Sequence, residues 1–156
     1  MKNNSGFTFI EIVMVIVILG ILAVFAMPKM IDIIGDTKVN STKDEMLTLK
    51  VAIVGDASLN TGGISTSKGY RGDVGSYPAQ LQDLVVKPDT VSAWDRTANN
   101  NLGAGWNGPY IQDDGTGNYL YDAWGKPYVL TSNSIISNGA NGIYEGGAGD
   151  DIVLKF

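Results

Sequence analysis

The feature that most constrains this chain is an apolar run from Ile12 to Met27 that contains no hydrogen-bonding side chain. Together with Phe7–Ile10 it approaches the ~20 residues that an α-helix needs to cross the hydrocarbon core of a membrane. Glu11 stands near the start of this run and is the only charged residue between Lys2 and Lys29. A carboxylate in lipid is costly and needs a partner. The sequence therefore predicts a membrane helix whose one charge has a specific function.

Two ordinary kinds of N-terminal segment compete with a specialised one. A signal anchor would keep Lys2 inside the cell and place everything after Pro28 outside. A secretory signal could be removed after Val24-Phe25-Ala26, which satisfies a small-residue cleavage rule. Neither alternative provides a partner for Glu11.

The spacing of Gly6, Phe7 and Glu11 favours a third interpretation. A short leader carrying Lys2 ends in Gly6, Phe7 follows, and Glu11 takes the fifth position after that glycine. In this pattern the first 30 residues resemble the class III signal of type IV pilins and type II secretion pseudopilins. Phe9 stands where that superfamily usually has Leu, a change that keeps the position apolar.

The resemblance implies a defined processing and assembly chemistry. A prepilin peptidase would cleave between Gly6 and Phe7 and N-methylate Phe7. The new amine of Phe7 would then be neutralised by Glu11 of a neighbouring subunit within a helical homopolymer. A buried ion pair of this kind gives register to apolar helices more reliably than it gives stability.

Gly20 and Pro28 weaken the helix between them, because Gly lowers helix propensity and Pro cannot donate to the helix hydrogen bonds. Their placement resembles that of a segment that melts in assembled filaments of the family. Ordinary kinking residues of a membrane helix explain them equally well. After Pro28 the apolar positions take helical spacing, which predicts an amphipathic helix that ends near Asn60–Gly63.

Beyond that helix the sequence predicts a small head. Residues 61–76 are expected to form a loop, and Pro78–Val85 a short helix with Pro at its first position. A Ser132-Asn133 turn between apolar residues indicates a hairpin. Strands are expected at Tyr119–Tyr121, Tyr128–Thr131, Ser134–Ser137 and Ile152–Phe156.

The predicted fold is α+β and pilin-like: a long N-terminal helix, transmembrane in its first half and amphipathic in its second, packs on a small antiparallel sheet. The segments are a leader 1–6, a membrane and polymerisation helix 7–28, its amphipathic continuation 29–60 and a head 61–156.

Two aromatic motifs in the head resemble the major pseudopilin family of type II secretion. They are Gly105–Tyr110 and Asp122–Tyr128, and Ala123 stands where the family has Pro. Aromatic side chains bury large apolar areas, so we expect these four to pack a core rather than bind a ligand: Trp106, Tyr110, Trp124 and Tyr128.

The tail from Ser137 to Asp151 is rich in Gly and ends in two adjacent carboxylates. Calcium prefers such hard oxygen ligands, and glycines let the backbone turn tightly around an ion. The family resemblance implies a structural calcium there, with Asn141, Asp150 and Asp151 as side-chain ligands. The alternative is a solvated acidic turn. A second acidic segment, Asp113–Asn118, is expected to be a plain turn.

Composition narrows the function further. The net charge of −5 argues against nucleic-acid binding, and the chain has no cysteine for a disulfide and no histidine for acid–base catalysis. We therefore expect no enzyme, and the resemblance to the major pseudopilin family implies a structural filament subunit.

The resemblance places the subunit in a bacterial inner membrane as a single-pass protein with a periplasmic head. Its expected partners are itself, the prepilin peptidase, an inner-membrane assembly platform and minor pseudopilins. One alternative is a type IV pilin of an extracellular fibre for adhesion, motility or DNA uptake. Another is a membrane-anchored, calcium-dependent periplasmic binding module.

Overall fold

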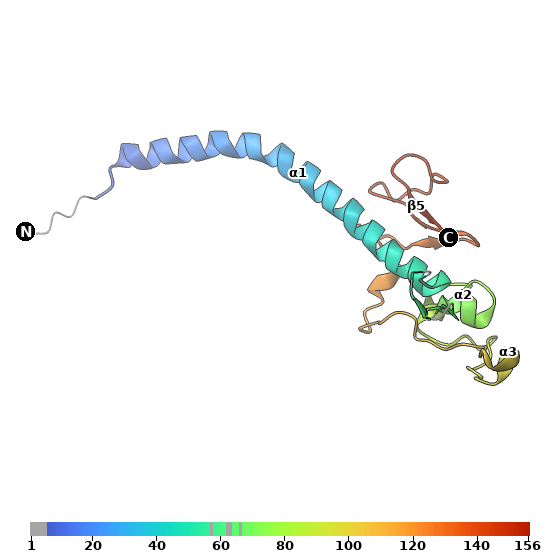
Figure 1. Ribbon diagram of the computed structural model, residues 1–156. Coiled ribbons are helices and arrows are strands. Elements are labelled where there is room, and N and C mark those ends of the chain that lie inside the picture. The colour runs from blue at the N-terminus through green and yellow to red at the C-terminus, as the bar shows by residue number, and fades with distance from the viewer. Residues whose placement is uncertain (1–5, 57, 62–63, 66) are drawn as a thin grey trace, which may run out of the picture. The chain divides into compact units, whose positions relative to one another are not determined.

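A computed structural model describes residues 6–56, 58–61, 64–65 and 67–156 (Figure 1). The side chains at 26–29, 31, 60, 61, 64, 65, 100 and 101 are not part of that description. The chain divides into two compact units, Met1–Thr37 and Lys38–Phe156. The predicted leader, apart from Gly6, and the side chain of Pro28 therefore lie outside the described residues.

The first helix, α1, runs from Phe9 to Val54 and passes through Gly20 and Pro28 as continuous helix. In the first unit its side chains from Phe9 to Phe25 are mostly apolar and exposed. The part of α1 in the second unit is amphipathic, and it buries Met46, Leu49, Ala52 and Ile53. In the part of the chain that the structure describes, no helix is both long enough and apolar enough to cross a membrane.

The helix ends at Val54, earlier than the predicted stop at Asn60–Gly63. Gly55 adopts φ +82° and donates its N–H to the Val51 carbonyl at 2.8 Å, which is the usual glycine-based end of a helix. The chain then passes close to Gly69, and Asp56 N–H donates to the Ser67 carbonyl at 3.1 Å. A Cβ on Gly55 would overlap that carbonyl. The close approach of two backbones, which sequence spacing does not reveal, fixes the end of α1.

Residues 61–76 are not the loop that the sequence predicted. The antiparallel strands β1 (Asn60–Thr61) and β2 (Ile64–Ser65) form a short ladder, and the helix α2 covers Gly69–Val74. Tyr70 of α2 is 2% exposed and packs in the core. Burial of this one aromatic side chain stabilises a helix whose glycines predict a loop.

The short helix expected at Pro78–Val85 is present, but it is the 3₁₀ helix η1 and begins at Leu81, ending at Leu84. Pro78 therefore precedes the helix. Gln80 is the N-cap, and Asp83 Oδ2 accepts the N–H groups of Ala79 (2.9 Å) and Gln80 (3.2 Å). This capping box places the start three residues later than proline alone suggested. The four-residue helix α3, Ala98–Asn101, follows.

The sheet agrees with most of the predicted strands. Strands β3 (Val129–Leu130), β4 (Ser134–Ser137) and β5 (Ile152–Lys155) are antiparallel in the order β3-β4-β5. Val129 pairs with Ile136 and Leu130 with Ile135, which confirms the hairpin. The strand predicted at Tyr119–Tyr121 is wrong, because Asn118–Leu120 forms the 3₁₀ helix η2.

The core lies where α1 meets the sheet, η1 and α2 within the second unit. The fully buried side chains include Met46 and Ile53 from α1, Leu84 from η1 and Ile135 from β4. Of the four predicted aromatics, Tyr128 is buried and Trp106 and Tyr110 pack against the core. Trp124 is half-buried and lies outside this cluster, in a tight turn where its backbone N–H donates to Asp122 Oδ1 at 3.0 Å. The prediction for Trp124 was wrong.

Substitution of Gly55 tests whether close backbone approach fixes the end of α1. Gly75 is a matched control, because its φ of +85° is similar but a Cβ there meets no described atom within 4 Å. We expect Gly75→Ala to lower the free energy of unfolding by about 1–2 kcal/mol through left-handed strain alone. Gly55→Ala should lower it by clearly more in urea titrations. Equal losses would mean that the approach to Ser67 is not tight.

Candidate functional site

The predicted assembly residues lie at the N-terminus of α1, where they form a reciprocal cap. Thr8 N–H donates to Glu11 Oε2 at 3.4 Å, and Glu11 N–H donates to Thr8 Oγ1 at 3.4 Å. Thr8 Oγ1 also lies 3.5 Å from Glu11 Oε2. Sequence reasoning missed Thr8, although Thr8-Phe9-Ile10-Glu11 matches the capping-box signature of a helix start. Glu11 thus has a local structural function besides the predicted pairing.

This cap does not neutralise the charge of Glu11. Its donors are a neutral amide and a neutral hydroxyl, and Glu11 itself is exposed in the single chain. A carboxylate has room for further donors, since each oxygen carries two acceptor sites. Glu11 can therefore accept a cationic group from another chain while it still caps its own helix.

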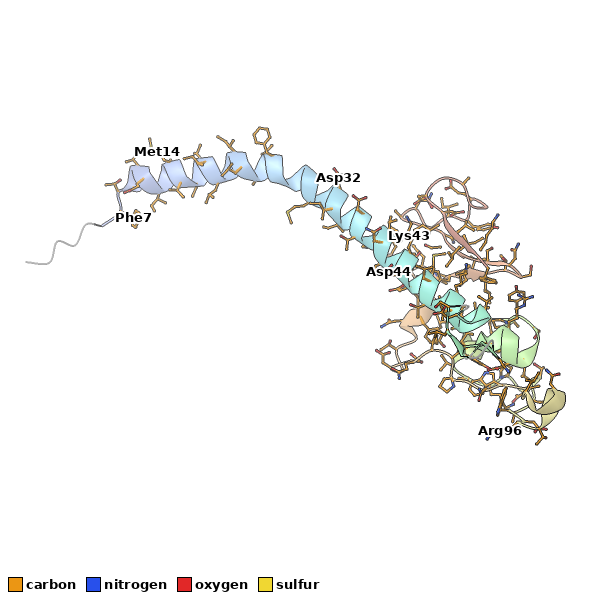
Figure 2. The ribbon with its side chains drawn as sticks, viewed as in Figure 1. Phe7, Met14, Asp32, Lys43, Asp44 and Arg96 are labelled. Atoms are coloured by element: carbon orange, nitrogen blue, oxygen red, sulfur yellow. The ribbon has the colours of Figure 1, made fainter. Side chains whose placement is uncertain are left out.

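The helix that follows Glu11 exposes apolar side chains on every side, as Figure 2 shows around Met14. Val13 is half-buried, and every other large apolar side chain from Phe9 to Phe25 is between 47% and 86% exposed. Phe7 is 79% exposed. Such a surface far exceeds the apolar patches that soluble monomers carry. It needs lipid or other protein chains to cover it.

The second candidate site is the Gly-rich loop between β4 and β5. Asp150 Oδ2 accepts the N–H of Asn141 at 2.8 Å. Asp151 Oδ2 accepts the N–H groups of Glu145 and Gly147, both at 2.9 Å. Each of the two predicted carboxylates therefore uses one oxygen to hold the loop backbone.

The other oxygen of each carboxylate is buried and has no hydrogen-bond partner among the described residues, and the same is true of Asn138 Oδ1. An unsatisfied buried polar atom is unfavourable, and an ionised oxygen more so. Three such oxygens in one loop fit the hard-oxygen chemistry of a bound cation. Within the described part of the chain, no group of three or more carboxylates is placed to hold a metal. A cation here would need amide or backbone oxygens as well.

Asn141, the third predicted ligand, is placed differently from Asp150 and Asp151. Its Oδ1 accepts the N–H of Ile143 at 2.6 Å, and its Nδ2 donates to Glu145 Oε2 at 3.4 Å. Sequence reasoning missed Asn138, because burial of its side-chain oxygen depends on the folded loop.

Glycines bring the loop backbone close to its acidic side chains. A Cβ on Gly139, which has φ +61°, would lie 2.7 Å from Asp150 Oδ2, and one on Gly149 would overlap the Glu145 carboxylate. A larger residue at either position would displace a carboxylate. The two glycines thus shape a cradle for the acidic groups.

A buried hydrogen-bond chain joins this loop to α1. Ser137 Oγ donates to Asp122 Oδ2 at 2.5 Å and accepts Gly139 N–H at 3.2 Å. Ser137 is fully buried and Asp122 is 5% exposed. The next residue, Ala123, donates its N–H to Thr42 Oγ1 of α1 at 3.2 Å. The conformation of the loop is therefore anchored on both the sheet and the helix.

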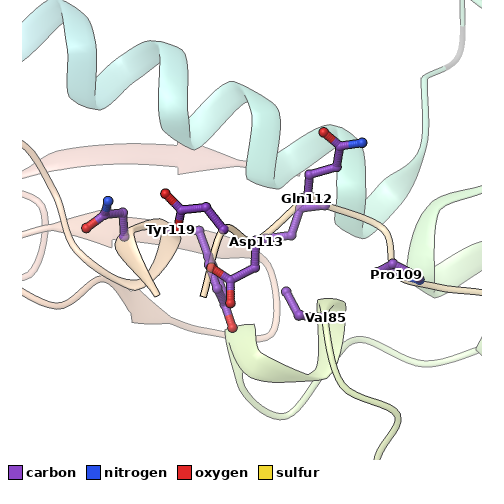
Figure 3. Close-up of a pocket in the computed structure, with 8 residues that line it drawn as sticks. Val85, Pro109, Gln112, Asp113 and Tyr119 are labelled. Carbon is purple, nitrogen blue, oxygen red and sulfur yellow. The ribbon is translucent and has the colours of Figure 1, made fainter. Parts of the chain in front are cut away.

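The acidic segment at Asp113–Asn118 behaves as the predicted turn. Asp113 Oδ1 accepts the N–H groups of Gly115 and Gly117, both at 3.2 Å. Hydrogen bonds from Thr116 lower the pKa of Asp114. Asp113, Asp114 and Asn118 line an open pocket of about 720 Å³ together with Val85, Pro109 and Tyr119 (Figure 3). Asp113 and Asp114 each accept hydrogen bonds at Oδ1 that hold the turn, so we interpret this segment as a turn rather than as a binding site.

Comparison with known proteins decides the family. Residues 46–155 match the family model described as type II secretion system (T2SS), protein G. The chain belongs to the type II secretion system protein G family. Residues 1–27 match the prokaryotic N-terminal methylation motif, which contains Gly6, Phe7 and Glu11.

Individual relatives agree with this membership. The type II secretion system core protein G of Pseudomonas aeruginosa is 29% identical over 159 residues, covering 96% of this chain and 92% of the relative. A fimbrial protein of Pseudomonas aeruginosa is 42% identical over 52 residues, 33% of this chain and 34% of its own. No solved structure matches.

Within this protein G family member, Ser137 provides a test of how the Gly-rich loop is anchored. Ser137→Ala leaves Asp122 and the Gly139 N–H without their partner in a buried place, so we expect a loss of about 1–3 kcal/mol in unfolding free energy. The exposed Ser132, in the turn before β4, is the control. Ser132→Ala should change stability by less than about 0.5 kcal/mol in the same denaturant titration. Similar effects of the two substitutions would contradict the anchoring function of Ser137.

Proposed function

We propose that this chain is a structural subunit, a major pseudopilin that polymerises into the pseudopilus of a type II secretion system. The observation that carries the proposal is the match of residues 46–155 to the protein G family, with the methylation motif at residues 1–27. In this function the protein performs no chemistry of its own. It supports protein secretion across the outer membrane as a filament.

We propose that assembly depends on one charge pair. A prepilin peptidase cleaves between Gly6 and Phe7 and methylates the new amine, which exists only after cleavage. Glu11 of the adjacent subunit accepts this amine. The cap from Thr8 supports the proposal, because it holds the carboxylate near the helix start without using its charge. A charge pair inside an apolar bundle favours one register over its neighbours, since any other register leaves both charges unpaired.

Before assembly, residues 7–28 are proposed to lie in the bacterial inner membrane as a single span, with the head in the periplasm. The exposed apolar surface from Phe9 to Phe25 supports this, because lipid covers such a surface without cost. Gly20 and Pro28 are proposed to bracket a segment that loses helix on polymerisation. The proposed partners of the filament are the inner-membrane assembly platform and the minor pseudopilins.

Two substitutions of Glu11 separate its two functions. Glu11→Ala removes both the cap and the charge, whereas Glu11→Gln keeps an oxygen for the Thr8 N–H and removes only the charge. If the charge pair directs assembly, both variants should be cleaved normally and both should fail to form ordered filaments. Electron microscopy of sheared filaments and immunoblotting of the processed chain measure the two steps.

A filament of normal length and order from Glu11→Gln would show that capping, and not pairing, is the function of Glu11. Thr8→Ala is the matched control, since it removes the hydroxyl that accepts the Glu11 N–H and keeps the charge of Glu11. Under the proposed mechanism its filaments keep their register.

A type IV pilin of an extracellular fibre is the second candidate, favoured by the match to fimbrial proteins over a third of the chain. Location distinguishes the two: filaments on the outer cell surface at native expression would favour the pilus. A membrane-anchored binding module would form no filament in either place.

We also propose that the Gly-rich loop holds a structural calcium ion. Support comes from the unpartnered oxygens of Asp150 and Asp151 and from the glycine cradle around them. These carboxylates would ligate the ion, which would neutralise two adjacent like charges. Asn141 is the amide ligand that the family resemblance implied, although its side-chain oxygen is engaged with Ile143.

Removal of calcium should destabilise the head. At a free calcium concentration about 100 times the dissociation constant, binding adds about 2.7 kcal/mol to stability, which corresponds to roughly 10 °C in melting temperature. We expect EGTA to lower the melting temperature of the full chain in detergent by this order. Excess CaCl₂ should restore it, and the same excess of MgCl₂ should not. An unchanged melting temperature in EGTA would disprove the calcium site.

A further inference from the structure

We propose that Asn138 supplies the amide ligand of the cation in the Gly-rich loop, in the position that the sequence pattern gives to Asn141. This inference rests on the calcium site proposed above and changes its ligand set. Asn138 has a buried Oδ1 without a hydrogen-bond partner among the described residues, as do Asp150 and Asp151 at their Oδ1 atoms. All three oxygens are buried, and each lacks a hydrogen-bond partner among the described residues.

The polar groups of Asn141 are used within its own turn. Its backbone N–H donates to Asp150, its Oδ1 accepts from Ile143 and its Nδ2 donates to Glu145. Asn141 is also exposed. These contacts give Asn141 a complete structural function: it closes the turn that carries Glu145. Withdrawing its Oδ1 to a cation would leave the Ile143 N–H without that partner.

The backbone at Asn138 is held on both sides. The preceding residue, Ser137, is fully buried and hydrogen-bonded to Asp122. The Asn138 carbonyl accepts the N–H of Gly142 at 3.1 Å. The following residue, Gly139, contacts Asp150 so closely that a Cβ there would lie within 2.7 Å of Asp150 Oδ2. Asn138 thus lies at the start of the loop, next to the residue that contacts Asp150. Asp150 is one of the two carboxylates that also have a buried oxygen without a hydrogen-bond partner among the described residues.

The chemistry of the three atoms matches one kind of ligand. Calcium accepts carboxylate and amide oxygens together and fills the rest of its shell with backbone carbonyls and water. A hydrogen-bond donor could satisfy one such oxygen, but a single cation satisfies all three. It also offsets the repulsion between Asp150 and Asp151. An amide oxygen adds a ligand without a third negative charge.

The assignment is tested by calcium titration of the full chain in detergent, with Asn138→Ala and Asn141→Ala as the matched pair. We expect Asn138→Ala to weaken calcium binding by at least about tenfold, the scale on which metal sites respond to loss of a partner. Asn141→Ala should stay within about threefold of the parent chain. Isothermal titration calorimetry with CaCl₂ gives both affinities.

Melting in EGTA distinguishes a ligand from a structural residue. Because Asn138 Oδ1 has no hydrogen-bond partner among the described residues, Asn138→Ala should melt at the parent temperature in EGTA and lose only the increment that calcium adds. Asn141→Ala should do the reverse, with a lower melting temperature in EGTA and most of the calcium increment kept. The two variants are thus expected to show opposite patterns.

A third variant guards against loss of folding. Asn138→Asp places a third carboxylate among the proposed ligands, beside Asp150 and Asp151, so it should melt lower than the parent in EGTA and regain calcium affinity to at least the parent value. Parent-like calcium binding by Asn138→Ala, or a loss in EGTA equal to that of Asn141→Ala, would overturn the assignment. If the parent chain itself binds no calcium, the calcium site fails and the assignment fails with it. Failure of Asn138 alone leaves the calcium site standing.

Discussion

The proposed assembly of this protein depends on one carboxylate at the start of an apolar helix. Glu11 can be tolerated beside lipid only if it has partners, and the single chain supplies neutral ones, the N–H and hydroxyl of Thr8. The missing cation must come from elsewhere. In the proposed mechanism a processed amine at Phe7 of another subunit supplies it, which would make cleavage after Gly6 a precondition of assembly. The apolar side chains that follow would hold neighbouring helices together in any register, and the proposed charge pair would select one register.

The head depends on α1 for its hydrophobic core. Its core forms where Met46, Leu49 and Ile53 meet the small sheet and the short helices, and the sheet alone has too few residues to enclose a core. The hydrogen-bond chain through Thr42, Ala123, Asp122 and Ser137 then extends this order to the Gly-rich loop. The loop carries the buried carboxylate oxygens of Asp150 and Asp151 that lack a hydrogen-bond partner among the described residues, so a bound cation would act on the same network that fixes the loop to α1.

The sequence predicted those parts whose cause is local. The spacing of Gly6, Phe7 and Glu11 identified the processing motif, and the Ser132-Asn133 turn identified the β3–β4 hairpin. Features that depend on distant contacts were missed. Gly55 ends α1 because the chain passes close to Ser67, and α2 forms because Tyr70 is buried. The aromatic run at Tyr119–Tyr121 has strand propensity, yet it forms η2, with Tyr119 and Leu120 packed against the core. No local sequence pattern marks Asn138, because only the folded loop buries its Oδ1 without a hydrogen-bond partner among the described residues.

The central claim is that assembly uses an amine created by cleavage after Gly6. Mass spectrometry of the N-terminus of the chain purified from a cell with its own secretion system tests this most directly. We expect a mature chain that begins with N-methylated Phe7. A chain that retains Met1 to Gly6, or one cleaved after Ala26, would contradict it, because no amine would then stand at Phe7 to pair with Glu11.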